Sequence, residues 1–115
     1  MNARELRIGN RIRRKSTGAS CIVTIPILQE IESGRHDYEY EPLTDEWLNR
    51  IGSHVRKSLG FAAYDLDENI TIYYNTTLTP NGFELNFGDF ETEIKYLHSL
   101  QNIIFEISNK EIQFQ

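Results

Sequence analysis

Cysteine, proline and long apolar runs are scarce in this chain. Cys21 is the only cysteine among 115 residues, so no internal disulfide forms, and no Cys/His cluster has zinc-site spacing. No stretch approaches the roughly 20 apolar residues that cross a bilayer, and residues 1–5 lack an apolar export core. With 3 Pro, 7 Gly and 25% charged residues, the composition is neither fibrous nor disordered. We therefore expect one globular domain over residues 1–115, located in the cytoplasm.

Positive charge is concentrated at one end. Residues 1–15 hold six basic residues against Glu5 alone, a net charge of +5, whereas residues 16–115 sum to −10. A basic end on an acidic chain suggests contact with phosphates or nucleic acid. The alternative is a solvated strand edge whose cations discourage unwanted pairing, and repulsion from the acidic remainder favours it. The candidate phosphate-contacting residues are Arg7, Arg11, Arg13, Arg14 and Lys15.

The apolar pattern predicts both strands and helices. A basic strand is expected after the turn at Gly9, and residues 21–28 predict a β-branched strand that either lies at a sheet edge or ends at Pro26. Further strands are predicted over residues 61–66, 70–74 and 83–87. Residues 44–51 predict a short helix with Thr44 as its N-cap and Gly52 as its C-cap. Apolar residues recur at helical spacing over 94–107, and Asn109 closes that helix.

The predicted fold class is α+β. We expect a small, mainly antiparallel sheet of about five strands, with the short helix at its margin and the long C-terminal helix packed on one face. By fold-level analogy alone, the N-terminal half is compatible with an SH3-like, partly open barrel.

Three segments of the chain resemble motifs of a known family: residues 2–10 (NARELRIGN), 42–48 (PLTDEWL) and 94–102 (IKYLHSLQN). Their order and spacing resemble an uncharacterised family of short, often prophage-associated bacterial proteins with an E-L-R-I-G-N opening, a P-L-T-E-E-W-L centre and an I-K-Y-V-H-x-L-Q-N close. The resemblance implies a small intracellular α+β protein of phage or mobile-element origin and brings no known activity. The arginines after Gly9 and the Ile103-Ile104 pair depart from the family pattern.

Two acidic segments were weighed as cation sites. The segment that begins at Asp65 starts like a calcium loop, but Ile70 replaces the required glycine and Thr76 stands where the bidentate Glu would be, which favours a β-turn. Asp89, Glu91 and Glu93 could hold a hard cation or supply an acid and a base. An acidic segment leading into the last helix explains them more simply, because negative charge suits a helix N-terminus.

The catalytic case is weak. His98 has no ligand partner at helical spacing and is expected to be a boundary histidine that hydrogen-bonds a backbone or side-chain acceptor. Cys21 is expected to be a small buried hydrophobe rather than a nucleophile. No G-x-S-x-G, P-loop or dinucleotide fingerprint occurs. A small hydrolase around Asp89, Glu91, Glu93 and His98 is the weakest hypothesis. We predict no catalytic residue, no metal site and no cofactor.

Tyrosines at 38, 40, 73 and 74 provide a candidate partner surface, although tyrosines in a small sheet more often pack across strands. The favoured hypothesis is a non-enzymatic protein-interaction module that binds a host or phage protein through its acidic surface or a sheet edge. The alternative is a nucleic-acid-binding accessory protein that uses the basic N-terminal segment. Self-association stays open.

Overall fold

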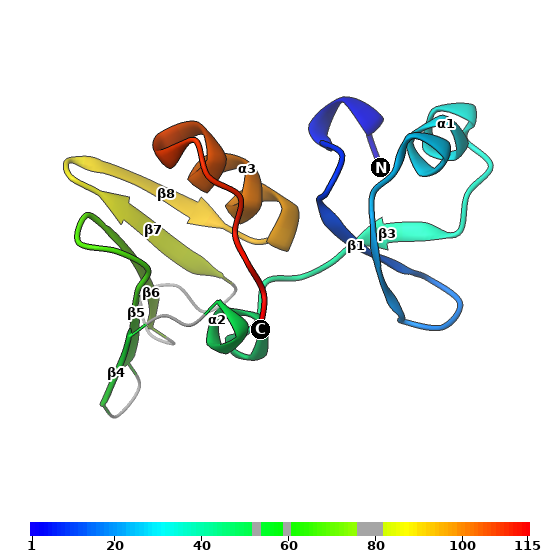
Figure 1. Ribbon diagram of the computed structural model, residues 1–115. Coiled ribbons are helices and arrows are strands. Elements are labelled where there is room, and N and C mark those ends of the chain that lie inside the picture. Colours follow the sequence, from blue (N-terminus) through cyan, green and yellow to red (C-terminus); the bar gives the residue numbers. More distant parts are fainter. Residues whose placement is uncertain (52–53, 59–60, 76–81) are drawn as a thin grey trace. The chain divides into compact units, whose positions relative to one another are not determined.

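The computed structural model describes residues 1–51, 54–58, 61–75 and 82–115 (Figure 1). The chain divides into two compact units, one formed by residues 1–42 and 96–111 and the other by residues 43–95 and 112–115. Eight strands in the described ranges form two antiparallel sheets, and helices accompany them. The α+β class is therefore confirmed, with the strands divided over two sheets rather than gathered in one. A single domain over residues 1–115 stays a prediction.

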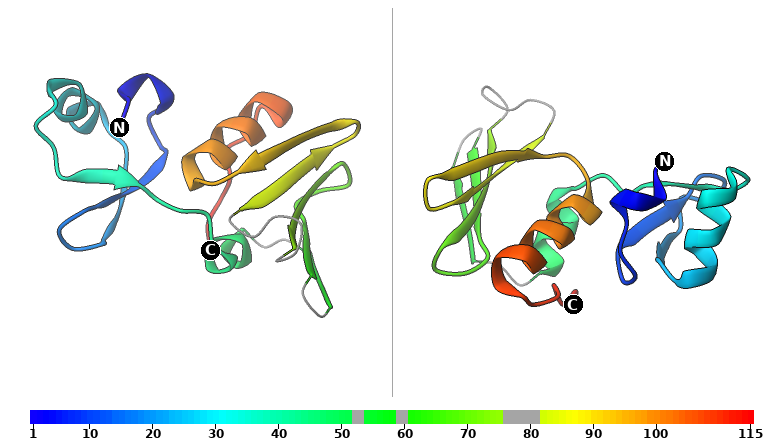
Figure 2. Two further views of the ribbon diagram at one scale, coloured as in Figure 1. Left: turned by 180° about the vertical axis from the view of Figure 1, so that it is seen from behind. Right: turned by 90° about the horizontal axis from the view of Figure 1, so that it is seen from above.

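The first unit contains a three-stranded sheet and the two longest helices. Its elements are η1 (Ala3–Glu5), β1 (Arg11–Arg14), β2 (Ser20–Ile22), α1 (Ile25–Ser33), β3 (Tyr38–Tyr40) and α3 (Leu97–Ser108), and the strand order is β2-β1-β3. The sheet is open, so residues 1–42 form no closed barrel. One hydrophobic cluster of this unit consists of the buried side chains Leu6, Ile12, Val23, Ile31 and Tyr38. Contacts link α3 to β1 and α1 to η1 (Figure 2).

The single strand predicted over residues 21–28 is wrong. Strand β2 ends at Ile22, and helix α1 begins at Ile25 with Pro26 in its first turn. Proline suits that position because the first helical N–H groups have no intrahelical acceptor and the proline φ is already helical. Gly34, in the left-handed region at φ 78°, ends the helix. Pro26 therefore starts a helix here instead of breaking a strand.

The second unit consists of helix α2 (Asp45–Arg50) and a five-stranded sheet. The strands are β4 (His54–Ser58), β5 (Phe61–Asp65), β6 (Ile70–Asn75), β7 (Phe83–Phe87) and β8 (Phe90–Ile94), in the order of the sequence. The predicted hairpin of residues 61–66 and 70–74 is confirmed as β5 and β6. The predicted cap of α2 is also confirmed, because the Thr44 hydroxyl accepts a hydrogen bond from the Trp47 N–H. Gly52, its expected C-cap, lies outside the described residues, as do residues 80 and 81 of the expected turn before β7.

The register gives the five-stranded sheet one apolar and one polar face. Tyr64, Ile72 and Leu85 stand opposite one another on β5, β6 and β7 and are fully buried. Successive side chains of a strand point to opposite faces. The other face therefore carries the polar residues of the next rows: Arg56, Asp65, Thr71, Tyr73, Glu84, Asn86, Glu91 and Glu93. An antiparallel sheet with this pattern packs one face on a core and hydrates the other.

The end of the chain departs from expectation in its boundaries. Helix α3 begins at Leu97, because Ile94 is the buried last residue of β8. Asn109 ends the helix in the left-handed region at φ 58°, as predicted. The packing of this helix on the five-stranded sheet stays a prediction. None of the helices in the described ranges has both the length and the apolar character that a membrane crossing requires.

Candidate functional site

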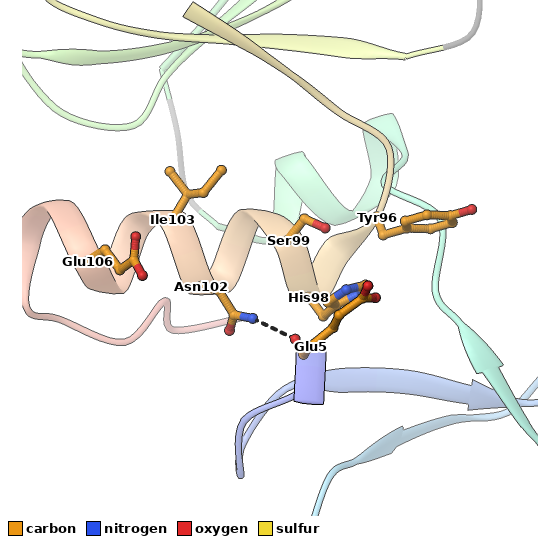
Figure 3. A pocket seen from close by; sticks show the side chains of 7 residues that line it. All are labelled: Glu5, Tyr96, His98, Ser99, Asn102, Ile103 and Glu106. Carbon is orange, nitrogen blue, oxygen red and sulfur yellow. Dashed lines mark hydrogen bonds between the residues drawn. The ribbon is translucent and has the colours of Figure 1, made fainter. Parts of the chain in front are cut away.

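A buried polar network in the first unit joins the turn before β1 to helix α3. The fully buried Asn10 donates from Nδ2 to Asn102 Oδ1 (2.8 Å), and its own Oδ1 accepts from the Arg7 N–H (2.6 Å). Asn102 donates to the carbonyl of Glu5 (3.1 Å), which Figure 3 shows as a dashed line. Gln101 accepts from the Arg11 N–H (2.7 Å) and donates to the Gly9 carbonyl (3.2 Å). Buried amides are stabilising only when paired in this way.

Arg7 belongs to the same network. Its Nε donates to Asn102 Oδ1 (2.8 Å), its guanidinium pairs with Glu111 (2.5 Å), and Nη2 donates to the Gln101 carbonyl (3.3 Å). The same group lies 4.5 Å from the centre of the Phe105 ring. The segments 2–10 and 94–102 thus contact each other through side chains. These contacts give both segments a structural role, which is to hold the N-terminal turn against helix α3.

A shallow groove lies beside this network. It encloses about 410 Å³, within the range of small-ligand sites. Helix α3, its N-cap residue and η1 supply its walls (Figure 3). The lining residues are Glu5, Tyr96, His98, Ser99, Asn102, Ile103 and Glu106.

Three rings pack together at one end of the groove. The Tyr40 ring is stacked on His98 with centroids 4.5 Å apart, and Tyr96 lies 5.0 Å from Tyr40 and 5.8 Å from His98. The Tyr40 hydroxyl donates to Glu5 Oε2 (2.6 Å) and accepts from the Asn2 N–H (3.0 Å). These contacts fix Glu5 beside the imidazole of His98 (Figure 3).

His98 is buried, with 4% of its surface exposed, and its Nδ1 makes no hydrogen bond. Burial lowers the pKa of His98 below its ordinary value, while the nearby Glu5 carboxylate raises it in part. The imidazole is therefore neutral at pH 7. The expectation of a boundary histidine bonded to an acceptor is wrong for Nδ1, because ring stacking rather than a hydrogen bond holds the side chain.

The predicted phosphate-contacting residues do not form one free basic surface. Arg7 is bound in the network, Arg13 pairs with Glu39 on β3 (2.6 Å), and Arg14 lies over the Tyr38 ring and contacts its hydroxyl (3.3 Å). Lys15 is exposed, and its backbone N–H donates to the carbonyl of Asp37, the residue before β3. Arg11 is part of β1 and bonds Gln101 through its N–H.

The four predicted partner-surface tyrosines do not gather on one surface. Tyr38 is 1% exposed and belongs to the core of the first unit, and Tyr40 lies in the ring cluster. Tyr73 and Tyr74 are neighbours on β6, so their side chains point to opposite faces of the five-stranded sheet. Tyr74 packs against Phe83 at 5.0 Å. For Tyr38, which lies beside Arg14 of β1, and for Tyr74, which lies beside Phe83 of β7, the cross-strand packing alternative is correct, whereas Tyr40 packs on His98 of helix α3.

The acidic residues that were expected to lead into the last helix instead belong to the β7–β8 hairpin. Gly88 and Asp89 form its turn, with Gly88 at φ 58°, and Glu91 and Glu93 lie on β8. Glu93 stands directly opposite Glu84, and Asn86 donates to Glu84 Oε1 (3.2 Å).

The tip of this hairpin is apolar and exposed. Phe87 and Phe90 face each other across the turn, with 36% and 51% of their surfaces exposed. Among the described strands, β8 pairs with β7 alone and stands last in the strand order of the sheet (Figure 1, yellow). An exposed aromatic pair at a sheet edge is typical of an interaction surface.

No described group of three or more His, Cys, Asp or Glu residues is arranged to hold a metal ion. At the start of the candidate calcium loop, Asp67 accepts from the N–H groups of Asn69 and Ile70, which closes the predicted turn. Burial raises the pKa of the Cys21 thiol, so the thiolate that nucleophilic chemistry needs is disfavoured.

Comparisons of this chain with protein-family models, with curated proteins and with solved structures find no match.

Several residues of these sites had no assigned role at the sequence level. Gln101 could have been noticed, because it is a polar residue within the apolar pattern of the last helix. Asn10 lies in the predicted turn at Gly9, which gave no indication that its side chain is buried. Phe87 continued an alternating strand and was expected to be buried, whereas it is exposed at the hairpin tip. Tyr96 and Glu5 gave no signal, because their meeting with His98 depends on η1 and α3 coming together.

Proposed function

We propose that this protein is a non-enzymatic protein-interaction module of phage or mobile-element origin, which acts in the cytoplasm and binds a host or phage protein through the β8 edge of its five-stranded sheet. The observation that supports the proposal is the β7–β8 hairpin, which combines the last strand in the order of the described sheet, an exposed aromatic pair and an excess of negative charge.

The charge of the hairpin favours a basic partner. Between residues 82 and 95 four acidic residues stand against Lys95 alone, and the second unit as a whole has a net charge of −5, while the first unit is neutral. Carboxylates directly opposite each other, as Glu84 and Glu93 are, destabilise a strand pair. A cationic partner would relieve that repulsion on binding.

The edge itself favours a different chain over a second copy. An extended segment can add to an edge strand through main-chain hydrogen bonds, with side-chain contacts providing specificity. Two β8 edges brought together would place Glu91 and Glu93 against carboxylates of the same kind, and like charge at an edge discourages self-pairing. Phe87 and Phe90 would supply the apolar anchors of the complex.

The nucleic-acid alternative has less support. Phosphate binding needs cations that are free to exchange counterions, but Arg7 and Arg13 are already paired with carboxylates. The acidic second unit would add repulsion.

Affinity capture from host lysate tests the proposal. The bait is the full chain, and the variant Glu91→Lys/Glu93→Lys reverses the charge of β8 without touching the apolar face. Glu68→Lys, an exposed residue of the β5–β6 turn in the same sheet, is the matched control. We expect one set of proteins to bind the natural chain and the control and to be lost with the double variant. Capture of nothing above background, or capture that the double variant leaves unchanged, would contradict the proposal.

A further inference from the structure

The groove on helix α3 carries charge of one sign only. Among its seven lining residues the charged ones are Glu5 and Glu106, both exposed, and neither a lysine nor an arginine is present. Two carboxylates without a cation among the other lining residues give this surface a negative potential. The groove therefore favours a cation.

The shape and chemistry of the lining narrow the kind of cation. The Tyr96 ring is 38% exposed at one end, and Ile103 offers an apolar contact along the helix. The Ser99 hydroxyl and the Asn102 amide add polar groups. An aromatic face, an apolar wall and carboxylates together suit a planar cation on an aliphatic stem, which can stack, pack and donate in one pose.

The base of the groove adds no opposing charge. His98 is buried under the Tyr40 ring, its Nδ1 has no hydrogen-bond partner, and the ring is neutral at pH 7. An imidazolium in that position would repel a bound cation. The neutral ring leaves the field of Glu5 and Glu106 unopposed by the other lining residues.

We propose that this groove binds the guanidinium group of an arginine side chain presented by a protein partner. The guanidinium lies at the end of the groove formed by Tyr96 and Glu5, where it stacks on the ring and donates to the Glu5 carboxylate, and its methylene stem runs along α3 toward Ile103. Glu106 lies about 15 Å further along the helix axis, so it adds negative potential and makes no contact with the guanidinium. Arginine is favoured over lysine because a compact, strongly hydrated ammonium gains less from an aromatic face and cannot donate in a planar fork. This site lies in the first unit and is separate from the β8 edge, so either proposal can fail while the other stands.

An NMR titration of the full chain tests the site directly. The probe is Nα-acetyl-arginine amide, followed by backbone amide shifts, and the comparison ligands are the corresponding citrulline amide, which is planar but uncharged, and lysine amide. We expect saturable shifts at residues 96–106 with arginine, and binding about tenfold weaker with citrulline because charge-assisted hydrogen bonds become neutral ones. Lysine is expected to fall between the two.

Two substitutions locate the effect. Glu5→Gln and Glu106→Gln each remove one charge and keep the shape. Glu5→Gln is expected to weaken arginine binding several-fold, and Glu106→Gln is expected to weaken it less, because its charge acts from a distance through solvent. Glu32→Gln, an exposed residue of α1 in the same unit, is the control and should leave binding unchanged. The Glu91→Lys/Glu93→Lys variant should also bind arginine normally, which separates this proposal from the proposed function.

Three results would overturn the inference. Equal shifts with arginine and citrulline would show that charge is irrelevant, and equal binding of lysine and arginine would remove the assignment to a guanidinium. Arginine shifts that survive both glutamine substitutions would place the cation elsewhere.

Discussion

Replacing Asn102 with alanine tests whether the polar network holds the first unit together. The side chain accepts from Arg7 Nε and from Asn10 Nδ2, both at 2.8 Å, and donates to the Glu5 carbonyl at 3.1 Å. The substitution removes all three bonds at once. It also leaves the Asn10 amide, which is fully buried, without that acceptor.

The cost follows from these contacts. At a net value of about 1 kcal/mol for each hydrogen bond, the three bonds contribute about 3 kcal/mol, and an unpaired buried amide adds about 1 kcal/mol more. Alanine regains about 0.5 kcal/mol through its better helix propensity. We therefore expect the free energy of unfolding to fall by about 3.5 kcal/mol, which for a chain of this size corresponds to a Tm lower by about 15 °C.

Urea unfolding followed by far-UV circular dichroism measures this difference. Asn86→Ala is the matched control, because it removes one 3.2 Å bond to Glu84 from a partly exposed strand position and should cost less than about 0.5 kcal/mol. Asn102→Asp keeps both acceptor contacts and loses the donor, so its cost should be about 1 kcal/mol. If Asn102→Ala were no more destabilising than Asn86→Ala, the network would not be what joins α3 to the N-terminal turn.

Three further predictions follow from single contacts. Thr44→Ala should lower the free energy of unfolding by about 1 kcal/mol, since it removes the N-cap bond to Trp47, and Thr44→Ser, which keeps the oxygen, should restore most of it in the same urea assay. Phe114→Ala should change the fluorescence of Trp47, whose ring it meets edge-on at 5.3 Å; an unchanged spectrum would mean that the C-terminal residues do not pack there in solution. Burial holds the pKa of His98 below the ordinary 6.5 of the unfolded chain, so the unfolded state binds more protons below that pH and the free energy of unfolding decreases as the pH falls. His98→Phe should therefore lose less stability between pH 7 and 5 than the natural chain. Parallel plots of unfolding free energy against pH would contradict the burial of His98 in solution.

Local elements of this fold could be predicted wherever a short-range rule decides. Thr44 followed by acidic residues and an apolar stripe predicts α2, and alternation over residues 83–87 predicts β7, because capping and the two-residue period act within a few positions. The sequence-based prediction failed where one residue is compatible with two local structures. Pro26 is as compatible with the first turn of a helix as with the end of a strand, and packing of Ile31 in the core of the first unit settles the choice.

The amino-acid sequence by itself determined the α+β class, the acidic excess and the lack of a familiar catalytic motif, since these depend on composition and local periodicity. Tertiary structure decided the roles of individual residues. Arg7 has the charge of a phosphate-binding residue, and only its position against Asn102 and Glu111 makes it part of a network; Glu5 and His98 become neighbours only when η1 meets α3. Contacts between residues more than ninety positions apart leave no periodic trace in a single chain, because their energy arises only after the backbone has brought them together.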